Sequence, residues 1–96
     1  TDDFSETKKR LDHKNEKLEA EYRALMEEKK EIAKNKNKYR SKSRAKKYNK
    51  VILKFNDKIE DYERRKKLFN EEVENYNKRV EKSYKNELEK RKKRIE

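Results

Sequence analysis

The residues with the most distinct chemistry are the lysines and arginines between positions 34 and 47. A basic residue occupies every second position from Lys34 to Lys46, with Asn, Tyr, Ser or Ala between them. Side-chain cations at this density attract phosphates, and they release condensed counterions when they neutralise a phosphate chain. The stretch is therefore predicted to bind a polyanion, and the candidate binding residues are Lys34, Lys36, Lys38, Tyr39, Arg40, Lys42, Arg44, Lys46 and Lys47.

The net charge of the chain is concentrated around this stretch. The 96 residues include 32 basic and 21 acidic ones, a formal net charge of +11. Ten of the basic residues and none of the acidic residues lie between Ile32 and Asn56, so the rest of the chain has a net charge of only +1. Nucleic acid is the expected partner, because Tyr39 can also stack on an exposed base. A bilayer is disfavoured, because Tyr39 is the one apolar anchor among these cations.

Other kinds of chemistry find little support. His13 is the only histidine, and the chain has no cysteine and no glycine. It therefore lacks the usual ligand sets of metal sites and the loops that hold nucleotide phosphates. Glu27, Glu28 and Glu31 cluster on one expected helix, but the sequence places no cleft around them that would shift a pKa. We expect a protein that is not an enzyme, with no cofactor, no metal and no small-molecule substrate.

The elements that position the basic stretch are expected to be helices. Charged residues make up 55% of the chain and hydrophobic residues 28%, and there is no glycine or proline to interrupt a helix. This composition is too polar for an ordinary globular core and is typical of coiled coils. Two kinds of chain fit it: a disordered polyampholyte, or long helices that share a narrow apolar seam.

An apolar heptad pattern in the second half favours the helices. Aromatic residues recur every seven positions from Tyr48 to Tyr76, and Ile or Val alternates with them except at Lys66. Spacings of four and three residues are those of a coiled-coil seam. We interpret Lys66 as a residue whose aliphatic stem packs in the seam. The expected seam and interaction residues, the last two after a drift in spacing, are Ile52, Phe55, Ile59, Tyr62, Phe69, Val73, Tyr76, Val80, Tyr84 and Leu88.

The first half carries a thinner apolar pattern that matches the second half in reverse order. One apolar residue recurs every seven positions from Phe4 to Tyr39, and the alternate positions are mostly charged. Folding the chain back near residue 41 sets position i against about position 82 minus i, so that Leu11 falls near Phe69. The poorer stripe is then covered by the richer one, whereas an unbroken helix would leave it without a good partner.

We therefore predict an all-α fold, an antiparallel two-helix coiled-coil hairpin, with helices at about residues 3–35 and 44–95 and a turn at about 36–43. Asp3 and Glu6 have the spacing of a capping box for the first helix. The Asn and Ser residues from 35 to 43 favour a turn, because their side chains compete for the backbone. A single helix throughout is the alternative.

A second chain is expected to complete the seam. Leu53 and Leu68 widen the apolar stripe, and Tyr84 and Leu88 lie past the reach of the first helix. The partner would be another copy of the chain, giving a four-helix assembly, or another helical protein. Because the chain begins with Thr1 and not with Met, we expect it to be part of a longer protein.

Four of the aromatic seam residues are followed directly by asparagine. The pairs are Tyr48-Asn49, Phe55-Asn56, Phe69-Asn70 and Tyr76-Asn77. This repeat resembles the aromatic-Asn heptads in coiled-coil segments of some bacterial proteins, envelope-associated ones among them. It covers about residues 48–80, and Tyr62, which precedes Glu63, departs from it. The resemblance implies a stalk or spacer and assigns no binding residue. The basic turn is also similar, in general design, to the tips of antiparallel arms in RNA-handling proteins.

Two functions remain open from the sequence. The first is a non-enzymatic scaffold or interaction module whose basic turn contacts nucleic acid. The second is a purely structural spacer, stalk or oligomerisation segment, as in a bacterial envelope-associated protein. Salt-dependent retention on RNA or DNA separates the two.

Overall fold

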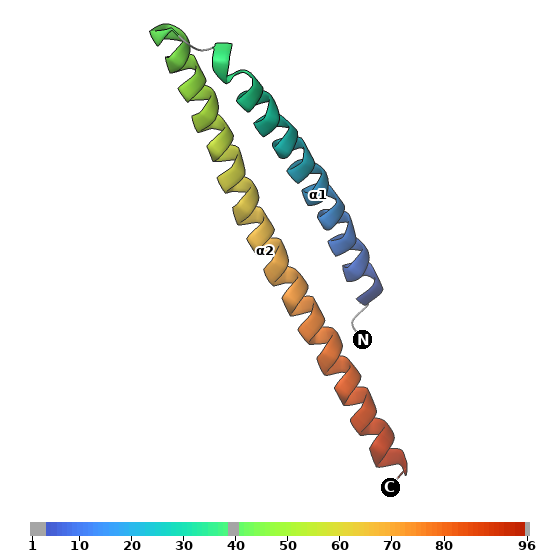
Figure 1. Ribbon diagram of the computed structural model, residues 1–96. Coiled ribbons are helices and arrows are strands. Elements are labelled where there is room, and N and C mark those ends of the chain that lie inside the picture. Colours follow the sequence, from blue (N-terminus) through green and yellow to red (C-terminus); the bar gives the residue numbers. More distant parts are fainter. Residues whose placement is uncertain (1–3, 39–40, 96) are drawn as a thin grey trace.

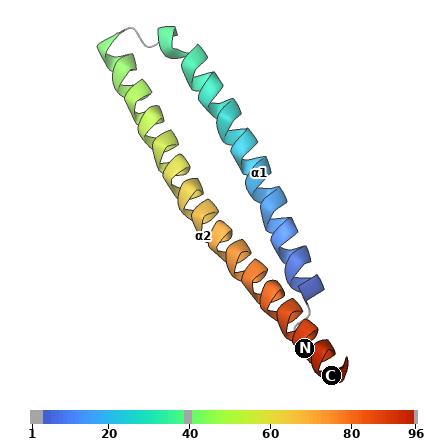
Figure 2. The ribbon, with the colours of Figure 1, turned by 60° about the horizontal axis from the view of Figure 1, so that its bottom comes forward.

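The computed structural model describes residues 4–38 and 41–95 and contains two long helices that run antiparallel (Figures 1 and 2). Helix α1 spans Phe4–Lys34, a short 3-10 helix η1 spans Lys36–Lys38, and helix α2 spans Lys42–Ile95. No strand occurs in these two ranges. The predicted all-α hairpin is confirmed, and the alternative of a single unbroken helix is wrong.

The ends of the helices agree with the charges near them. Helix α1 has Glu6 in its first turn and Lys34 in its last turn, so each charge opposes the nearer end of the helix dipole. The predicted capping residue Asp3 lies outside the described residues. Helix α2 begins at Lys42 and continues unbroken through Val80, where the apolar spacing drifts. A change in the seam pattern therefore alters which face is apolar without ending the helix.

The core of the hairpin is a narrow seam between the helices. Five residues of the described chain are buried, namely Leu11, Leu18, Leu25, Phe55 and Phe69. Leu11 and Leu18 cluster around Phe69, and Tyr62, Val73 and Tyr76 pack against this cluster. The contact of Leu11 with Phe69 is the one that the reverse match of the two apolar patterns predicts. The three leucines supply the single apolar residue per heptad in α1, and the larger side chains of α2 cover them.

Two aromatic pairs lie further along the same seam. The rings of Phe4 and Tyr76 meet edge to face, with centroids 6.0 Å apart, and the Tyr76 hydroxyl donates a hydrogen bond of 3.4 Å to the carbonyl of Phe4. The rings of Tyr22 and Tyr62 lie 5.9 Å apart. Residue numbers thus rise along α1 as they fall along α2, and aromatic contacts help to set this register.

Lys66, the polar residue in the heptad pattern of α2, is half-buried beside this seam. Its Nζ lies 5.2 Å from the centroid of the Phe69 ring. A cation over an aromatic face at this distance is attracted by the ring quadrupole. The stem of Lys66 therefore occupies a seam position while its charge finds a favourable partner at the edge.

Ion pairs across the seam join the two helices. Glu72 accepts hydrogen bonds from Arg10 (3.1 Å) and Lys14 (2.8 Å). Nearer the turn, Lys58 donates to Glu28 at 2.9 Å. Between these, Arg65 reaches Glu21 through both terminal nitrogens, with its Nη1 at 2.8 Å. Each exposed pair is worth little alone, but the pairs favour one register of the helices over others.

Acid is expected to weaken the hairpin through these pairs. The hydrogen bond from Lys14 lowers the pKa of Glu72 below its ordinary value of 4.5, and that from Arg65 does the same for Glu21. A carboxylate with a lowered folded-state pKa stabilises the fold above its unfolded-state pKa, and this contribution is lost as the pH falls through the folded-state pKa. Helicity measured by circular dichroism should therefore decrease between about pH 5 and pH 3.

A matched variant isolates the part of this acid effect that comes from the seam. Glu21→Gln with Glu72→Gln removes both titrations and should make the stability of the hairpin less dependent on pH in that range. Glu74→Gln with Glu81→Gln, which alters only pairs within α2, should leave the profile as in the unmodified chain. A Glu21/Glu72 variant that loses helicity with acid as steeply as the unmodified chain would contradict the prediction.

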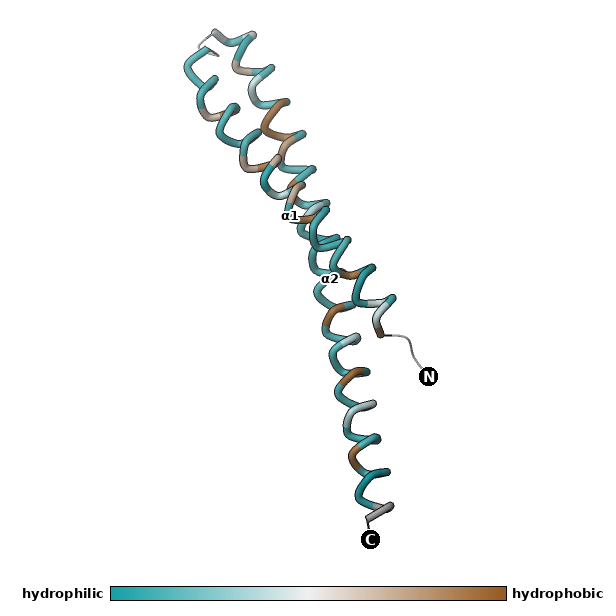
Figure 3. The backbone as a smooth tube through the Cα atoms, turned by 90° about the vertical axis from the view of Figure 1, so that its right-hand side faces the viewer, coloured by the Kyte–Doolittle hydropathy of each residue, from teal (hydrophilic) through white to brown (hydrophobic). Residues whose placement is uncertain are grey.

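Helix α2 extends well beyond its partner. It has 54 residues and α1 has 31. Since α1 begins at Phe4, whose ring meets that of Tyr76, residues 77–95 extend past the end of α1, with only Asn77 still beside it (Figures 1 and 2). We call residues 77–95 the overhang. Hydrophobic positions recur along it (Figure 3), and the whole molecule is a rod of 82 × 16 × 16 Å. Neither helix, over the residues described, has an apolar stretch that would span a bilayer.

Candidate functional site

The basic stretch forms the end of the rod where the chain reverses. We call residues 34–47 the tip. At the end of α1 the backbone N–H of Asn35 donates to the carbonyl of Glu31 at 3.1 Å, and the N–H of Lys38 donates to the carbonyl of Asn35 at 3.0 Å. These bonds tighten the chain into η1, as is common after the last turn of an α-helix.

Ser41 starts the second helix. Its Oγ accepts a hydrogen bond of 3.2 Å from the backbone N–H of Arg44, and its carbonyl accepts one of 2.8 Å from the N–H of Ala45. This is the geometry of an N-cap. Because Ser41 is the cap, α2 begins at Lys42, two residues before the predicted start at residue 44. The positively charged side chains of Lys42 and Arg44 are thus attached to a defined helix end.

Removing this cap is expected to loosen the tip. Ser41→Ala deletes the acceptor for the Arg44 N–H and should lower the stability of the hairpin by about 1 kcal/mol. Faster hydrogen exchange at the amide of Arg44 would report the loss. Ser43→Ala is the control, since the side chain of Ser43 is exposed within the first turn of α2. Equal exchange rates at Arg44 in the two variants would contradict the assignment of Ser41 as the cap.

The cations of the tip are exposed and have few acidic neighbours. Lys34 forms an ion pair of 3.6 Å with Glu31, and the guanidinium of Arg44 donates across the turn to the carbonyl of Lys38 at 3.4 Å. Among the described residues, no other cation of the tip forms an ion pair. The side chains that the structure describes as exposed are those of Lys34, Lys36, Lys38, Lys42, Arg44, Lys46 and Lys47. The predicted site residues Tyr39 and Arg40 lie outside the described residues.

This arrangement can hold anions but offers little for reading a sequence of bases. Lys50 and Lys54 extend the exposed positive charge along the first turns of α2. Exposed cations that are close together raise the local concentration of phosphate groups and shed counterions on contact. Base-specific recognition requires side chains that project together from an element that fits a groove, and the described residues of the tip offer no such set of side chains. Binding here would depend on charge and shape.

The predicted seam residues divide into two groups. Phe55 and Phe69 are buried against α1, and the six others from Ile52 to Val80 are half-buried. Tyr84 and Leu88 lie on the overhang and are exposed, with 65% and 40% of their surface accessible. The residues up to Tyr76 therefore belong to the packing within the hairpin, whereas Val80, Tyr84 and Leu88 lie on the overhang, where Tyr84 and Leu88 offer an apolar surface to another molecule.

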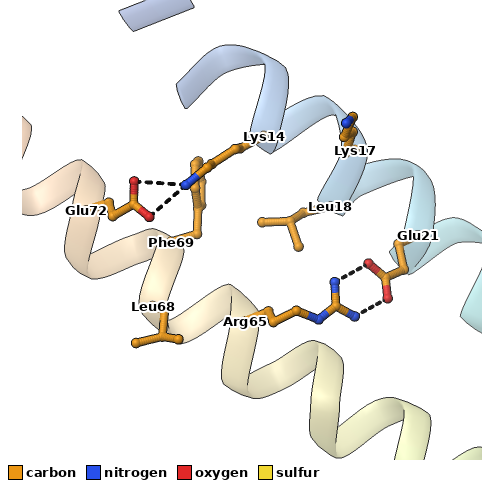
Figure 4. A pocket seen from close by; sticks show the side chains of 8 residues that line it. All are labelled: Lys14, Lys17, Leu18, Glu21, Arg65, Leu68, Phe69 and Glu72. Carbon is orange, nitrogen blue, oxygen red and sulfur yellow. Dashed lines mark hydrogen bonds and ion pairs between the residues drawn. The ribbon is translucent and has the colours of Figure 1, made fainter. Parts of the chain in front are cut away.

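A shallow groove of about 420 Å³ runs beside the seam on one face of the hairpin. Figure 4 shows Leu18, Leu68 and Phe69 between two interhelical ion pairs, Lys14–Glu72 and Glu21–Arg65. Leu68 is more than half exposed. The heptad pattern identified Leu18. It did not identify the ion pairs at the rim of the groove, because they join residues about 50 positions apart in the sequence. Complementary charges at matching positions of the reverse register were the signal that would have found them.

Comparisons of this chain with protein-family models, with curated proteins and with solved structures found no match. The interpretation of the tip, the groove and the overhang therefore depends on their own geometry and charge.

Proposed function

We propose that this protein is a non-enzymatic helical scaffold whose tip binds a polyanion, with nucleic acid as the partner. The observation that carries the proposal is the crowding of exposed cations at one end of a rod. Seven basic side chains of the tip are exposed, and no acidic residue occurs between Ile32 and Asn56 to neutralise them. The stability of the fold does not require this crowding of cations, because repulsion among like charges opposes folding.

Nucleic acid fits the shape of the tip better than other polyanions do. The rod is only 16 Å across, and its cations lie on both α1 and the start of α2 around the turn. A narrow end of this kind can approach a phosphate backbone from many directions. A phosphate chain offers a charge at regular short intervals, so several lysines can be neutralised together. The tip has few apolar side chains for insertion into lipid, which argues against a bilayer.

Salt dependence of binding tests this proposal. Fluorescence anisotropy of labelled duplex RNA and duplex DNA should report binding that weakens linearly, on logarithmic scales, between about 50 and 200 mM salt. The expected slope is about −0.9 for each phosphate contacted on B-DNA. Sequences of different composition should bind with similar affinity. Absence of binding at low salt, or binding that does not respond to salt, would overturn the proposal.

Association with another helical chain, either a second copy or a different protein, is part of the same proposal. The hairpin exposes 8715 Å² of surface, whereas a compact monomer of 12.0 kDa exposes about 6000 Å². The excess corresponds to the thin rod and its overhang, and only five side chains of the described residues are buried. Sedimentation equilibrium in the absence of nucleic acid distinguishes self-association, which gives a mass above 12.0 kDa, from a dependence on a different partner.

A structural spacer is the second candidate. The feature that favours it is the length of the rod, 82 Å from end to end, most of it supplied by the single helix α2. A spacer would tolerate loss of the charges at the tip, but it would not tolerate loss of the seam. The charge-reversal variant of the tip and the Phe69→Ala variant of the seam, both described in the Discussion, therefore separate this function from polyanion binding.

A further inference from the structure

The charge of the molecule is divided into three zones along the rod. Residues 32–56, around the turn, carry ten basic and no acidic residues. The part of the described chain where the helices pair, residues 4–31 and 57–76, carries 13 basic and 15 acidic residues, a net charge of −2. The overhang carries nine basic and three acidic residues, a net charge of +6. The two ends are thus positive and the middle is negative.

The contacts explain why the cations of the two ends stay unneutralised. In the middle, Arg10, Lys14, Lys58 and Arg65 are paired with acids of the opposite helix. The overhang has no opposite helix, because α1 begins at Phe4. Among the described residues, the ion pairs of the overhang lie within α2 and are Lys78–Glu74 and Lys85–Glu81.

Five further cations of the overhang have no ion pair with any residue that the structure describes. All are exposed, and they are Arg79, Lys82, Lys90, Arg91 and Lys92. The overhang is therefore a second surface with a strong attraction for anions. It differs from the tip in being a straight, regular helix with cations on several sides.

The distance between the two ends makes them independent sites. Lys46 and Lys90 are separated along one continuous helix by about 66 Å at 1.5 Å per residue. Electrostatic interactions in physiological salt decay over about 8 Å. A single phosphate chain lying along the rod would have to pass the acidic middle, which repels it. Two separate polyanion segments, one at each end, avoid this repulsion.

We propose that the overhang is a second polyanion-binding site, so that one molecule bridges two nucleic-acid segments held apart by the rod. This inference rests on the proposed function of the tip. The partner of the overhang is a phosphate chain, chosen because its charge complements the net +6 of this segment. The same positive charge opposes side-by-side pairing of two overhangs, although Tyr84 and Leu88 supply an exposed apolar face.

A capture experiment tests the bridge. One DNA duplex is fixed to a surface, a second labelled duplex is added in solution, and the amount of second duplex held by the protein is measured. The overhang variant replaces Lys82, Lys90, Arg91 and Lys92 with Glu. It should reduce capture of the second duplex by about tenfold or more, and it should leave measurable binding to a single duplex through the tip.

The control variant makes the same change in net charge in the middle of the rod. It replaces Lys9, Lys17, Lys29 and Lys67 with Glu, all of them exposed and without ion pairs to described residues. Capture by this variant should stay within about twofold of the unmodified protein. An overhang variant that captures as well as the control would overturn the inference.

Bridging through the pairing of two overhangs is tested by a second variant. Tyr84→Ser with Leu88→Ser removes the apolar face of the overhang and keeps its charges, so it should still capture the second duplex. Loss of capture in this variant would assign the overhang to a second copy of the chain and overturn the inference. An unmodified protein that binds one duplex but captures no second one would also overturn it, and the function of the tip would stand. Failure to bind any duplex would remove both.

Discussion

Phe69→Ala is expected to destabilise the hairpin by about 3–5 kcal/mol, enough to unfold most of the paired region at room temperature. Phe69 is only 7% exposed and lies between Leu11 and Leu18 in the buried cluster. The Nζ of Lys66 also lies over the ring of Phe69, 5.2 Å from the ring centroid. Truncation would leave a cavity against both leucines and would remove the partner of a half-buried cation.

Urea unfolding followed by far-ultraviolet circular dichroism measures this loss. Leu68→Ala is the neighbouring control, because Leu68 is 56% exposed and lies at the rim of the groove. Its truncation should cost less than about 1 kcal/mol, since little apolar surface is returned to water. Similar losses for the two variants would show that stability does not come from the seam and would contradict the packing described above.

In a chain whose overhang already carries Glu at residues 82, 90, 91 and 92, so that the second site is removed, reversing four charges at the tip is expected to weaken nucleic-acid binding by about a thousandfold or more near 0.1 M salt. The variant replaces Lys36, Lys38, Lys42 and Lys46 with Glu, and all four side chains are exposed. Each lost phosphate contact removes about 0.9 from the slope of affinity against salt, so the slope should become shallower by about four. New acidic side chains would repel phosphates in addition.

The tip variant is not expected to unfold. Lys42 lies in the first turn of α2, where an acidic side chain interacts favourably with the helix dipole. None of the four lysines forms an ion pair with a described residue, so no partner is left unsatisfied. Circular dichroism should therefore match that of the unmodified protein while anisotropy reports the loss of binding.

The control for the tip is the variant of the middle with Glu at Lys9, Lys17, Lys29 and Lys67, made in the same overhang background. It has the same net charge as the tip variant, so a general electrostatic effect would weaken both equally. A local site would be disturbed only by the first. If the tip variant binds as tightly as this control, the tip does not bind nucleic acid, and the spacer function becomes the better explanation.

Together these variants separate the parts of the rod by what each one would lose. The seam variant loses the fold, the tip variant loses nucleic-acid binding at the tip, and the overhang variant loses capture of the second duplex. The acidic middle would then act as an insulating spacer between two cationic ends. Its ion pairs set the register, and the register sets how far α2 extends past α1.

Local periodicity was enough to predict the helices and their direction. Heptad spacing from Tyr48 to Tyr76 gives α2 one apolar stripe, and leucines such as Leu11 and Leu18 give α1 a thinner one. A helix with such a stripe must cover it, and a reversal of the chain sets the rich stripe against the poor one within one molecule. The concentration of cations near the turn follows from the positions of the lysines and arginines in the sequence. These features depend on residue type and spacing, which are present in the linear chain.

The tertiary structure decided which charges are neutralised, and it fixed the end of the paired region beside Tyr76, although the sequence already placed Tyr84 and Leu88 past the reach of the first helix. The overhang follows from the position of the turn and the start of α1, because moving a turn by one residue shifts the opposed positions by two. From the sequence alone, residues 77–95 were counted with the rest of the chain outside the basic stretch, which is nearly neutral as a whole, so their own positive charge was not recognised. The ion pairs of Glu72 and Glu21 likewise required side chains from two helices to meet across the seam. Contacts of this kind depend on how the helices lie against one another, which no spacing within a single helix specifies.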